Sequence, residues 1–289
     1  MMEYYAIIVT YNPEISRLVQ NIDNLAKQGF SVVIVDNNSE NRDIIKKSEQ
    51  TYKGIYLDKN YGIAKALNVG MEYAVSKGAK WILSSDQDTI ISDNILDEYK
   101  KYISLKDAGA LCPSVIRGDG FRTKIDAEYV AVERCPTSGF FLSAKAWNEG
   151  CRYDEWMFID YVDYDICIQL KIKGYKIYQI RDTYIIQNLG NPAVIKPVEK
   201  IGKLIGSKKL INLSHTYNHT PFRNYYFVRN SLYYQYKYKK HINYKKERNF
   251  FIKWEVKKLL LEKHKVLLVK SIIRGIHDCA THIKETQVR

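Results

Sequence analysis

Short, almost wholly apolar runs alternate with helical patterns in the first half of this 289-residue chain. Residues 4–9 and 31–35 are two such runs, and apolar residues recur between them at helical spacing from Leu18 to Leu25. A strand, a helix and a second strand of this kind form a βαβ unit, and continuous apolar strands are typical of a parallel sheet that is buried on both faces. The predicted fold class is therefore α/β.

The same alternation continues further along the chain. Strands are predicted at residues 54–57 and from residue 81 to about the carboxylate at residue 86, with a helix from residue 63 to 74 between them. A run at residues 110–112 is expected to end at Pro113, because proline has no N–H for the ladder of a sheet. Further helices are predicted over residues 93–105, 144–147, 166–173, 250–261 and 266–282, with strands over 137–142 and 175–180.

The charge of the chain is uneven. From residue 191 on there are 22 Lys and Arg against 6 Asp and Glu, a net charge of +16, which leaves −3 for the first 190 residues of a chain with 45 basic and 32 acidic residues. Residues 191–221 hold three prolines and two glycines and are predicted to be a loop-like joint. We expect a catalytic domain over residues 1–205 and a basic, aromatic-rich helical region over residues 206–289.

Composition excludes several classes of protein. A hydrophobic content of 46% and a charged content of 27% are those of a globular protein. The five cysteines are widely spaced and never form Cys-x-x-Cys, so a zinc site or a disulfide framework is not expected. The first residues lack the basic and apolar stretches of a signal peptide, and no window approaches the roughly 20 apolar residues of a membrane span. We therefore expect a cytoplasmic protein.

Two carboxylates follow the apolar run at residues 81–83 at alternate positions, Asp86 and Asp88. Paired Asp oxygens are hard ligands for Mg²⁺ or Mn²⁺, which typically keep open positions for substrate phosphates. The alternative is an Asx turn or a helix cap, since Asp is a common turn residue. The pair alone leaves both interpretations open.

Three other polar clusters also follow predicted strands: residues 10–12, 36–39 and 60–62. In open α/β sheets, ligands bind beyond the carboxyl ends of the strands. We therefore expect these clusters and the Asp86–Asp88 pair to converge on one edge of the sheet.

Six ordered motifs together resemble glycosyltransferase family 2, over about residues 4–190. They lie at residues 8–12, 35–39, 60–62, 86–88, 138–140 and 162–165. The Asp-Gln-Asp form of the fourth motif, the segment 158–163 and the segment 219–230 resemble the rhamnosyltransferase branch of that family.

The resemblance implies a GT-A fold, a nucleoside-diphosphate sugar as donor, a divalent cation and inversion at the anomeric carbon. It assigns the metal to Asp86 and Asp88, and the N–H of a uracil or thymine base to the carboxylate of Asp36. The nucleotide-sugar site implied by the matching motifs comprises Thr10, Tyr11, Asn12, Asp36, Asn38, Asn60, Gly62, Asp86 and Gln87.

The resemblance also assigns the catalytic base. The Glu-Asp-x-Asp motif of the family places Asp163 in that role, at the start of the predicted helix over residues 166–173, where a helix N-terminus favours an ionised carboxylate. The alternative is a helix cap made by Asp163 or Asp165. Val162 stands where the motif has Glu, so an acceptor-orienting role of that carboxylate is missing or moves to Asp160.

The resemblance also suggests residues for the acceptor side and a further ligand position for the metal, from where they stand relative to the motifs of the family. The acceptor-side candidates are Asp160, Asp165, His219 and Arg223. Gln187 stands where many relatives have a metal-binding His, so the ion is held loosely, or His215 or His219 approaches from the later segment. The alternative for either histidine, which we favour, is a hydrogen-bonded structural or acceptor-side role.

The expected function is transfer of L-rhamnose from dTDP-rhamnose to a lipid-linked saccharide in cell-surface polysaccharide biosynthesis. The basic C-terminal half then meets an anionic membrane at the inner face of the cell membrane, because helices edged with lysine bind such surfaces. Within the family, a transferase that uses a UDP-linked hexose is the nearest alternative. In another class, a noncatalytic protein could bind nucleic acid through residues 215–260, but the carboxylates at positions 86, 88 and 163 argue against a nucleic-acid partner.

Overall fold

The computed structural model describes residues 3–47, 51–117, 122–123, 125–187, 193–216, 220–262 and 264–288. By contacts between residues the chain divides into two units. The first comprises Met1–Phe158 and Val162–Asn188, and the second comprises Ile159–Tyr161 and Leu189–Arg289. The tripeptide Ile159–Tyr161 thus groups with the C-terminal helices, although in sequence it lies within the first unit.

A nine-stranded sheet forms the centre of the first unit. Its strands are β1 (Tyr4–Thr10), β2 (Ser31–Asp36), β3 (Lys53–Tyr56), β4 (Trp81–Asp86), β5 (Ile90–Ile91), β6 (Ala108–Arg117), β7 (Tyr129–Val132), β8 (Phe140–Ser143) and β9 (Lys176–Gln187). The order is β3-β2-β1-β4-β8-β6-β9-β5, with β7 also paired to β9. From the pairings, β1, β2, β3, β4, β6 and β9 run one way, and β5, β7 and β8 run the other. The predicted α/β class with a mostly parallel sheet is confirmed.

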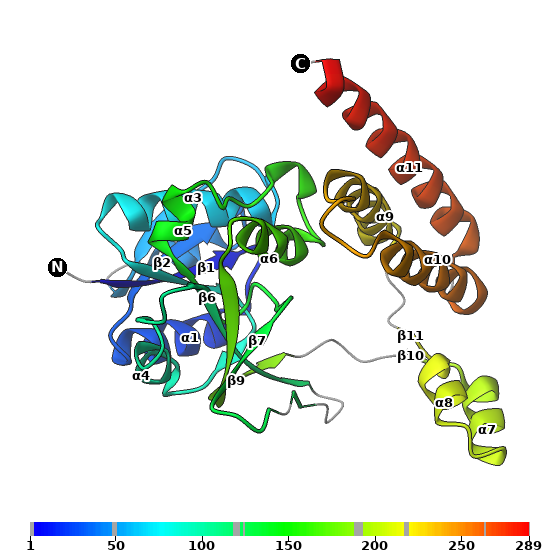
Figure 1. Cartoon of the computed structure of the whole chain (residues 1–289), viewed down its shortest axis with the longest axis horizontal. Coiled ribbons are helices and arrows are strands. Elements are labelled where there is room, and N and C mark those ends of the chain that lie inside the picture. The colour runs from blue at the N-terminus through cyan, green and yellow to red at the C-terminus, as the bar shows by residue number, and fades with distance from the viewer. Residues whose placement is uncertain are drawn as a thin grey trace. The chain divides into compact units, whose positions relative to one another are not determined.

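Helices cover both faces of this sheet (Figure 1). They are α1 (Ile15–Lys27), α2 (Arg42–Lys47), α3 (Ile63–Ser76), α4 (Ile95–Lys100), α5 (Ala144–Asn148) and α6 (Val162–Ile172). Ala6 and Ile8 of β1 belong to a buried cluster with the apolar faces of α1 and α4. Ile7 points the opposite way, toward α3, where Gly70 leaves room for its side chain. Alternate residues of one strand therefore serve two layers of core, as expected for a strand buried on both sides.

Several sequence-based boundaries in the first unit are wrong, including those of the strands predicted at 137–142 and 175–180, which are β8 and the longer β9. Strand β6 continues through Pro113, because the pairing with β9 shifts register between Pro113 and Ser114 and needs no N–H there. Helix α4 covers only residues 95–100 of the predicted 93–105. Helix α6 begins at Val162, four residues earlier than predicted, so Asp163 lies inside its first turn.

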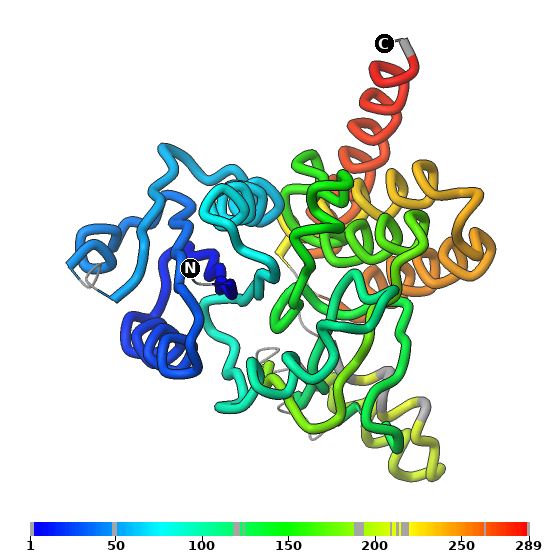
Figure 2. Tube along the Cα trace, turned by 60° about the vertical axis from the view of Figure 1, so that its left-hand side comes forward, coloured from blue at the N-terminus to red at the C-terminus, as the bar shows by residue number. Residues whose placement is uncertain are grey.

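The second unit is mainly helical. Its elements are β10 (Ala193–Val194), α7 (Lys196–Leu204), α8 (Lys208–Ser214), β11 (His215–Thr216), α9 (Pro221–Lys237), α10 (Tyr244–Leu261) and α11 (Lys265–Val288). Helices α9, α10 and α11 pack against one another (Figures 1 and 2). The predicted loop-like joint over residues 191–221 is wrong where it is described, since Pro197 occupies the first turn of α7, where a helix tolerates proline.

A buried polar network joins these three helices. Lys258 of α10 is buried and its Nζ lies 2.8 Å from Oε1 of Glu255. It also donates to Asn224 of α9, whose amide donates to Ser271 of α11 at 2.9 Å. Burial lowers the pKa of Lys258, and the charge of Glu255 opposes that shift.

Within the described part of the chain, none of the helices combines the length and the hydropathy that a membrane span requires.

Candidate functional site

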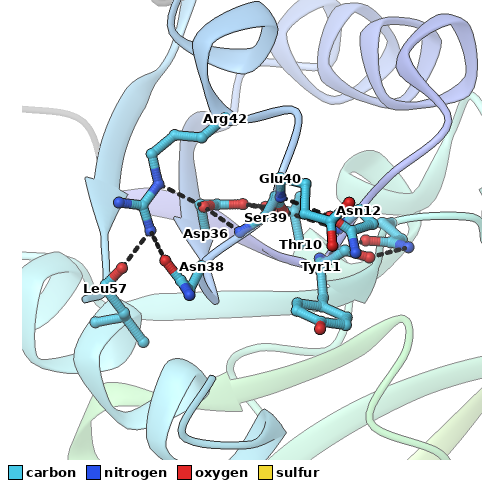
Figure 3. A network of polar contacts seen from close by, with 10 residues as sticks. Thr10, Tyr11, Asn12, Asp36, Asn38, Ser39, Glu40, Arg42 and Leu57 are labelled. Atoms are coloured by element: carbon cyan, nitrogen blue, oxygen red, sulfur yellow. Dashed lines mark hydrogen bonds and ion pairs between the residues drawn. The ribbon is translucent and has the colours of Figure 1, made fainter. Parts of the chain in front are cut away.

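The carboxylate of Asp36 is the centre of a hydrogen-bond network at the ends of β1 and β2 (Figure 3). Asp36 is fully buried. Its Oδ1 accepts from the hydroxyls of Thr10 at 3.0 Å and Ser39 at 2.5 Å. Its Oδ2 accepts from the Ser39 N–H at 3.0 Å and from Nε of Arg42 at 3.1 Å. Four donors fill the roughly four lone-pair positions of a carboxylate, so a nucleotide base can bond to Asp36 only by replacing one of them.

The loops after β1 and β2 are held together by the same network. The Asn12 N–H donates to Ser39 Oγ at 2.8 Å, and the Glu40 N–H donates to Oδ1 of Asn12 at 2.7 Å. Asn12 and Asn38 both have positive φ, at 49° and 68°, a conformation that Asn tolerates better than most residues. The predicted polar clusters at residues 10–12 and 36–39 therefore form one continuous surface.

Gln87, which lies between Asp86 and Asp88, links that segment to the cluster at residues 10–12. Its Oε1 accepts from the Tyr11 N–H at 2.7 Å, and its Nε2 donates to the Tyr11 carbonyl at 3.2 Å. The side chain of Gln87 is thus used to fix the backbone of Tyr11. The Tyr11 side chain itself is 49% exposed.

Asn60 and Gly62 form a tight turn before α3. The Gly62 N–H donates to Oδ1 of Asn60, and the Tyr61 N–H donates to Oδ1 of Asn37, both at 2.9 Å. Gly62 has φ +85°, and a Cβ there would lie 2.5 Å from the carbonyl oxygen of Phe158. Any residue other than glycine is excluded at this position, because Phe158 already occupies the space that a side chain would need. The turn is therefore tied both to the end of β2 and to the segment that precedes α6.

Asp86 and Asp88 stand at the end of β4, as predicted from the sequence. The Asp86 N–H donates to Oγ of Ser138 at 3.1 Å, and Ser138 in turn donates to Thr89 at 2.8 Å. Asp88 is exposed, and in the described part of the chain its carboxylate takes part in no hydrogen bond or ion pair. Such a carboxylate is open to a cation.

The donor set at this strand end fits Mg²⁺ or Mn²⁺. Both ions accept one or two carboxylates together with phosphate oxygens and water. Among the described residues, no third His, Cys, Asp or Glu joins Asp86 and Asp88 in a group that could hold a metal. An ion at these two residues therefore has coordination positions left for a diphosphate.

Gln187 ends β9 close to the same motif. Strands β5 and β9 are antiparallel, with Ile90 paired to Ile186. The next residues in this register are Thr89 and Gln187, which brings the end of β9 beside the Asp-Gln-Asp segment. The side chain of Gln187 is partly buried. The position predicted from the sequence is thus adjacent to the carboxylates, and its role as a ligand stays a prediction.

Asp163 lies in the first turn of α6 and is partly buried. Its Oδ1 accepts from the N–H of Tyr164 at 2.9 Å. Burial raises the pKa of Tyr153, the nearby hydroxyl of Ser84 lowers it, and the negative charge of Asp163 adds to the rise. The helix begins at Val162, so Asp163 and Asp165 both lie inside its first turn, and the role of Asp163 as base or as a partner of the first-turn N–H groups stays a prediction.

The predicted acceptor-side residues have different environments. Asp165 is fully buried and accepts from the side chain of Gln169, one helical turn later. Asp160 forms an ion pair with Arg223 of α9, with Nη2 3.0 Å and Nε 3.3 Å from Oδ1. His219 lies outside the described residues, and so does the side chain of His215.

The backbone around Asp160 is held by α9. The amide of Asn230 donates to the carbonyls of Ile159 at 2.7 Å and Asp160 at 3.0 Å, and the hydroxyl of Tyr161 donates to Ser231 at 2.9 Å. Phe158, Asp160 and Tyr161 all have positive φ. Such conformations persist only where surrounding contacts impose them.

Sequence reasoning missed Arg42 and Ser138. Arg42 pairs with Asp36, donates to Oδ1 of Asn38 at 3.1 Å and also donates to the carbonyl of Leu57. In the sequence, the feature that could have indicated Arg42 is a single basic residue about one helical turn after the cluster at residues 36–39. Ser138 carried no signal of its own beyond its place in a motif.

Comparisons with known proteins identify the family and the fold. A family model described as glycosyl transferase family 2 matches residues 5–154. The chain is 32% identical over 249 residues to a protein named dTDP-rhamnosyl transferase RfbF from Shigella flexneri, and the match covers 78% of each chain.

Solved structures share the fold. TarS 1-349 of S. aureus, in complex with UDP-GlcNAc, has a TM-score of 0.52 at 17% identity, covering 78% of this chain and 71% of the other. GalNAc-T7 with UDP, GalNAc and Mn²⁺ has a TM-score of 0.55 at 14% identity, covering 80% of this chain and 50% of the other. The predicted GT-A architecture is confirmed by these neighbours.

Proposed function

The chain belongs to glycosyltransferase family 2, and from that premise we propose that it transfers L-rhamnose from dTDP-rhamnose to a lipid-linked saccharide in cell-surface polysaccharide biosynthesis. The observation that carries the choice of donor is the likeness to the Shigella flexneri relative, whose name states that donor. Because a fold hosts many functions, the proposal also depends on the chemistry of the site.

The nucleotide is proposed to bind over the surface formed by the clusters at residues 10–12 and 36–39. Tyr11 offers an exposed ring on a backbone that Gln87 fixes, which suits stacking against a thymine. Asp36 holds Thr10, Ser39 and Arg42 in place, and a base N–H reaches its carboxylate when one of these donors turns away. Asn60 and Gly62 then form the turn over which the diphosphate passes.

Asp86 and Asp88 are proposed to hold Mg²⁺ or Mn²⁺. When bound, that ion stabilises the negative charge that accumulates on the departing nucleoside diphosphate. The contribution of the chain itself is to fix the end of β4, through the bond from the Asp86 N–H to Ser138. Asp88 stays exposed beyond that anchor.

Asp163 is proposed as the general base. It takes the proton of the acceptor hydroxyl while that oxygen forms a bond to the anomeric carbon and the bond from that carbon to the diphosphate oxygen breaks, so configuration inverts. The first turn of α6 carries partial positive charge and favours the ionised carboxylate that a base needs. Asp160 and Arg223 are proposed to border the acceptor as a fixed ion pair.

The acceptor is proposed to reside in a membrane, with the enzyme at its inner face. The net charge of +16 after residue 190 provides attraction to anionic lipid.

A donor panel tests the proposed function. The protein is incubated with dTDP-rhamnose, UDP-glucose, UDP-galactose and UDP-N-acetylglucosamine, with Mg²⁺ or Mn²⁺, and release of each nucleotide is measured. Water can take the place of the acceptor, and we expect dTDP release to be fastest, because the relative from Shigella flexneri is named for that donor. Fastest release of UDP would assign a UDP-hexose donor instead, and no release from any donor would contradict the function.

Tyr11 provides a prediction about nucleotide binding. Tyr11→Ala should weaken dTDP binding about tenfold or more, since stacking on an aromatic ring contributes about 1–3 kcal/mol per base. Tyr11→Phe should bind like the wild type. Calorimetry with dTDP measures both, and Tyr236→Ala, which removes a tyrosine of similar exposure from α9, is the matched control. Equal affinity of Tyr11→Ala and the control would remove Tyr11 from the site.

A further inference from the structure

Helix α7 (Lys196–Leu204) exposes a row of aliphatic side chains. Ile201 is 54% exposed, Leu204 is 85% exposed and Ile205, which follows the helix, is 62% exposed. Residues spaced by three and four lie on the same side of a helix, so the three form one continuous apolar strip. Leu204 is the most exposed large apolar side chain in the described part of the chain.

The strip does not serve the packing of α7 against α8. The two helices form a hairpin (Figure 1), and their contact is made at Gly202, which is buried. A Cβ at Gly202 would lie 2.9 Å from the backbone nitrogen of Ile211, so the backbones meet there. The contact with α8 thus fixes which side of α7 faces inward, and the aliphatic strip lies outside it.

Lysines border this strip. Lys196, Lys200 and Lys203 are exposed and follow one another at helical spacing, and Lys208 is exposed at the start of α8. The acidic residue of α7 is Glu199, whose Oε1 lies 2.6 Å from Nζ of Lys203. A surface of this kind fits a partner that has an apolar interior to receive the aliphatic side chains and negative charge at its surface to pair with the lysines.

We propose that α7 lies in the interface of an anionic lipid bilayer, with Ile201, Leu204 and Ile205 at the boundary of head groups and acyl chains. The lysines then contact lipid phosphates, as in other interfacial amphipathic helices. A second copy of the chain fits less well, because two lysine borders repel each other, and nucleic acid offers no apolar depth for three aliphatic side chains. The inference rests on the proposed function insofar as it names the element that brings the enzyme to a lipid-linked acceptor.

Vesicle sedimentation with the full chain tests the proposal. Vesicles contain phosphatidylglycerol mixed with phosphatidylcholine, or phosphatidylcholine alone. The wild type should sediment with the anionic vesicles, and less so at high salt, where charges are screened. Leu204→Ser/Ile205→Ser should lower partitioning at least about tenfold, because two aliphatic side chains no longer leave water.

Ile273→Ser, which changes a 62% exposed aliphatic residue of α11, is the matched control and should partition like the wild type. Wild-type binding retained by the α7 variant, or an equal loss in the control, would overturn the proposal. The proposal would also be overturned if the α7 variant kept lipid binding but no longer dimerised or had lower thermal stability. The aliphatic side chains of α7 would then pack against protein.

Release of dTDP from dTDP-rhamnose in solution separates this proposal from the proposed function. The α7 variant should release nucleotide at the wild-type rate. A protein that binds vesicles through α7 but releases no nucleotide would contradict the proposed function alone, and a protein that releases nucleotide but ignores anionic vesicles would contradict the membrane proposal alone.

Discussion

Asp163→Asn is expected to reduce turnover by about 10²–10⁴-fold, the usual contribution of a general base. The amide has nearly the shape of the carboxylate and can still accept from the Tyr164 N–H, but it cannot take the proton of an acceptor hydroxyl. Affinity for dTDP should stay within about threefold of the wild type, because a base on the acceptor side adds little to ground-state binding of the nucleotide. Initial rates of transfer and calorimetric titration with dTDP measure the two effects.

Asp182→Asn is the matched control for this variant. Asp182 is exposed and pairs with Arg181, so the same chemical change there should leave turnover unchanged. Near-normal turnover of Asp163→Asn would show that another group accepts the proton, whereas equal loss of turnover and of dTDP affinity would show that the variant disturbs the donor site.

Asp88→Asn should remove most of the dependence of the enzyme on divalent cations. Lewis-acid stabilisation of charge contributes several kcal/mol, so kcat/KM should fall by about 10²–10³-fold. The open carboxylate of Asp88 is the feature behind this expectation, since other described groups do not compete for it. Titration of dTDP with and without Mn²⁺ provides a second readout, and the gain in affinity from Mn²⁺ should be lost in the variant.

Asp93→Asn, five residues later and also exposed, is the control for the Asp88 variant. It should keep the wild-type response to Mn²⁺ and to its removal with EDTA. If Asp88→Asn responded to Mn²⁺ as the wild type does, the cation would be held elsewhere or would have no part in donor binding.

Much of the fold could be predicted because its strands are apolar on both faces. The runs at residues 4–9 and 31–35 allow no solvent-exposed side and therefore indicate a covered parallel sheet, which β1 and β2 confirm. The ends of these strands then locate the polar clusters without knowledge of any contact. That reasoning correctly brings Thr10, Asp36 and Gln87 together at one edge.

Element boundaries and long-range partners could not be predicted in the same way. Pro113 reads as a strand end, but a register shift, which has no sequence signal, carries β6 past it. Arg42 reaches Asp36 only because α2 starts where the loop after β2 ends, and Ser138 bonds to Asp86 only because β8 pairs with β4. Such contacts depend on the pairing of distant segments, which periodicity does not encode.

The cysteines provide a further example. Cys112, Cys135 and Cys167 are far apart in sequence, yet they come together in the first unit. Burial raises the pKa of the Cys135 thiol, with smaller contributions from hydrogen bonds to the other two. Spacing alone could not predict this cluster, because it is formed by β6, a loop and α6.

A crystal structure of the protein with dTDP and Mn²⁺, recorded at the manganese absorption edge, tests the central claim most directly. We predict one anomalous peak in coordination contact with Asp88 and both phosphates, and a thymine beside Tyr11 and Thr10. Manganese away from Asp88, or dTDP bound away from the ends of β1 and β4, would contradict the account.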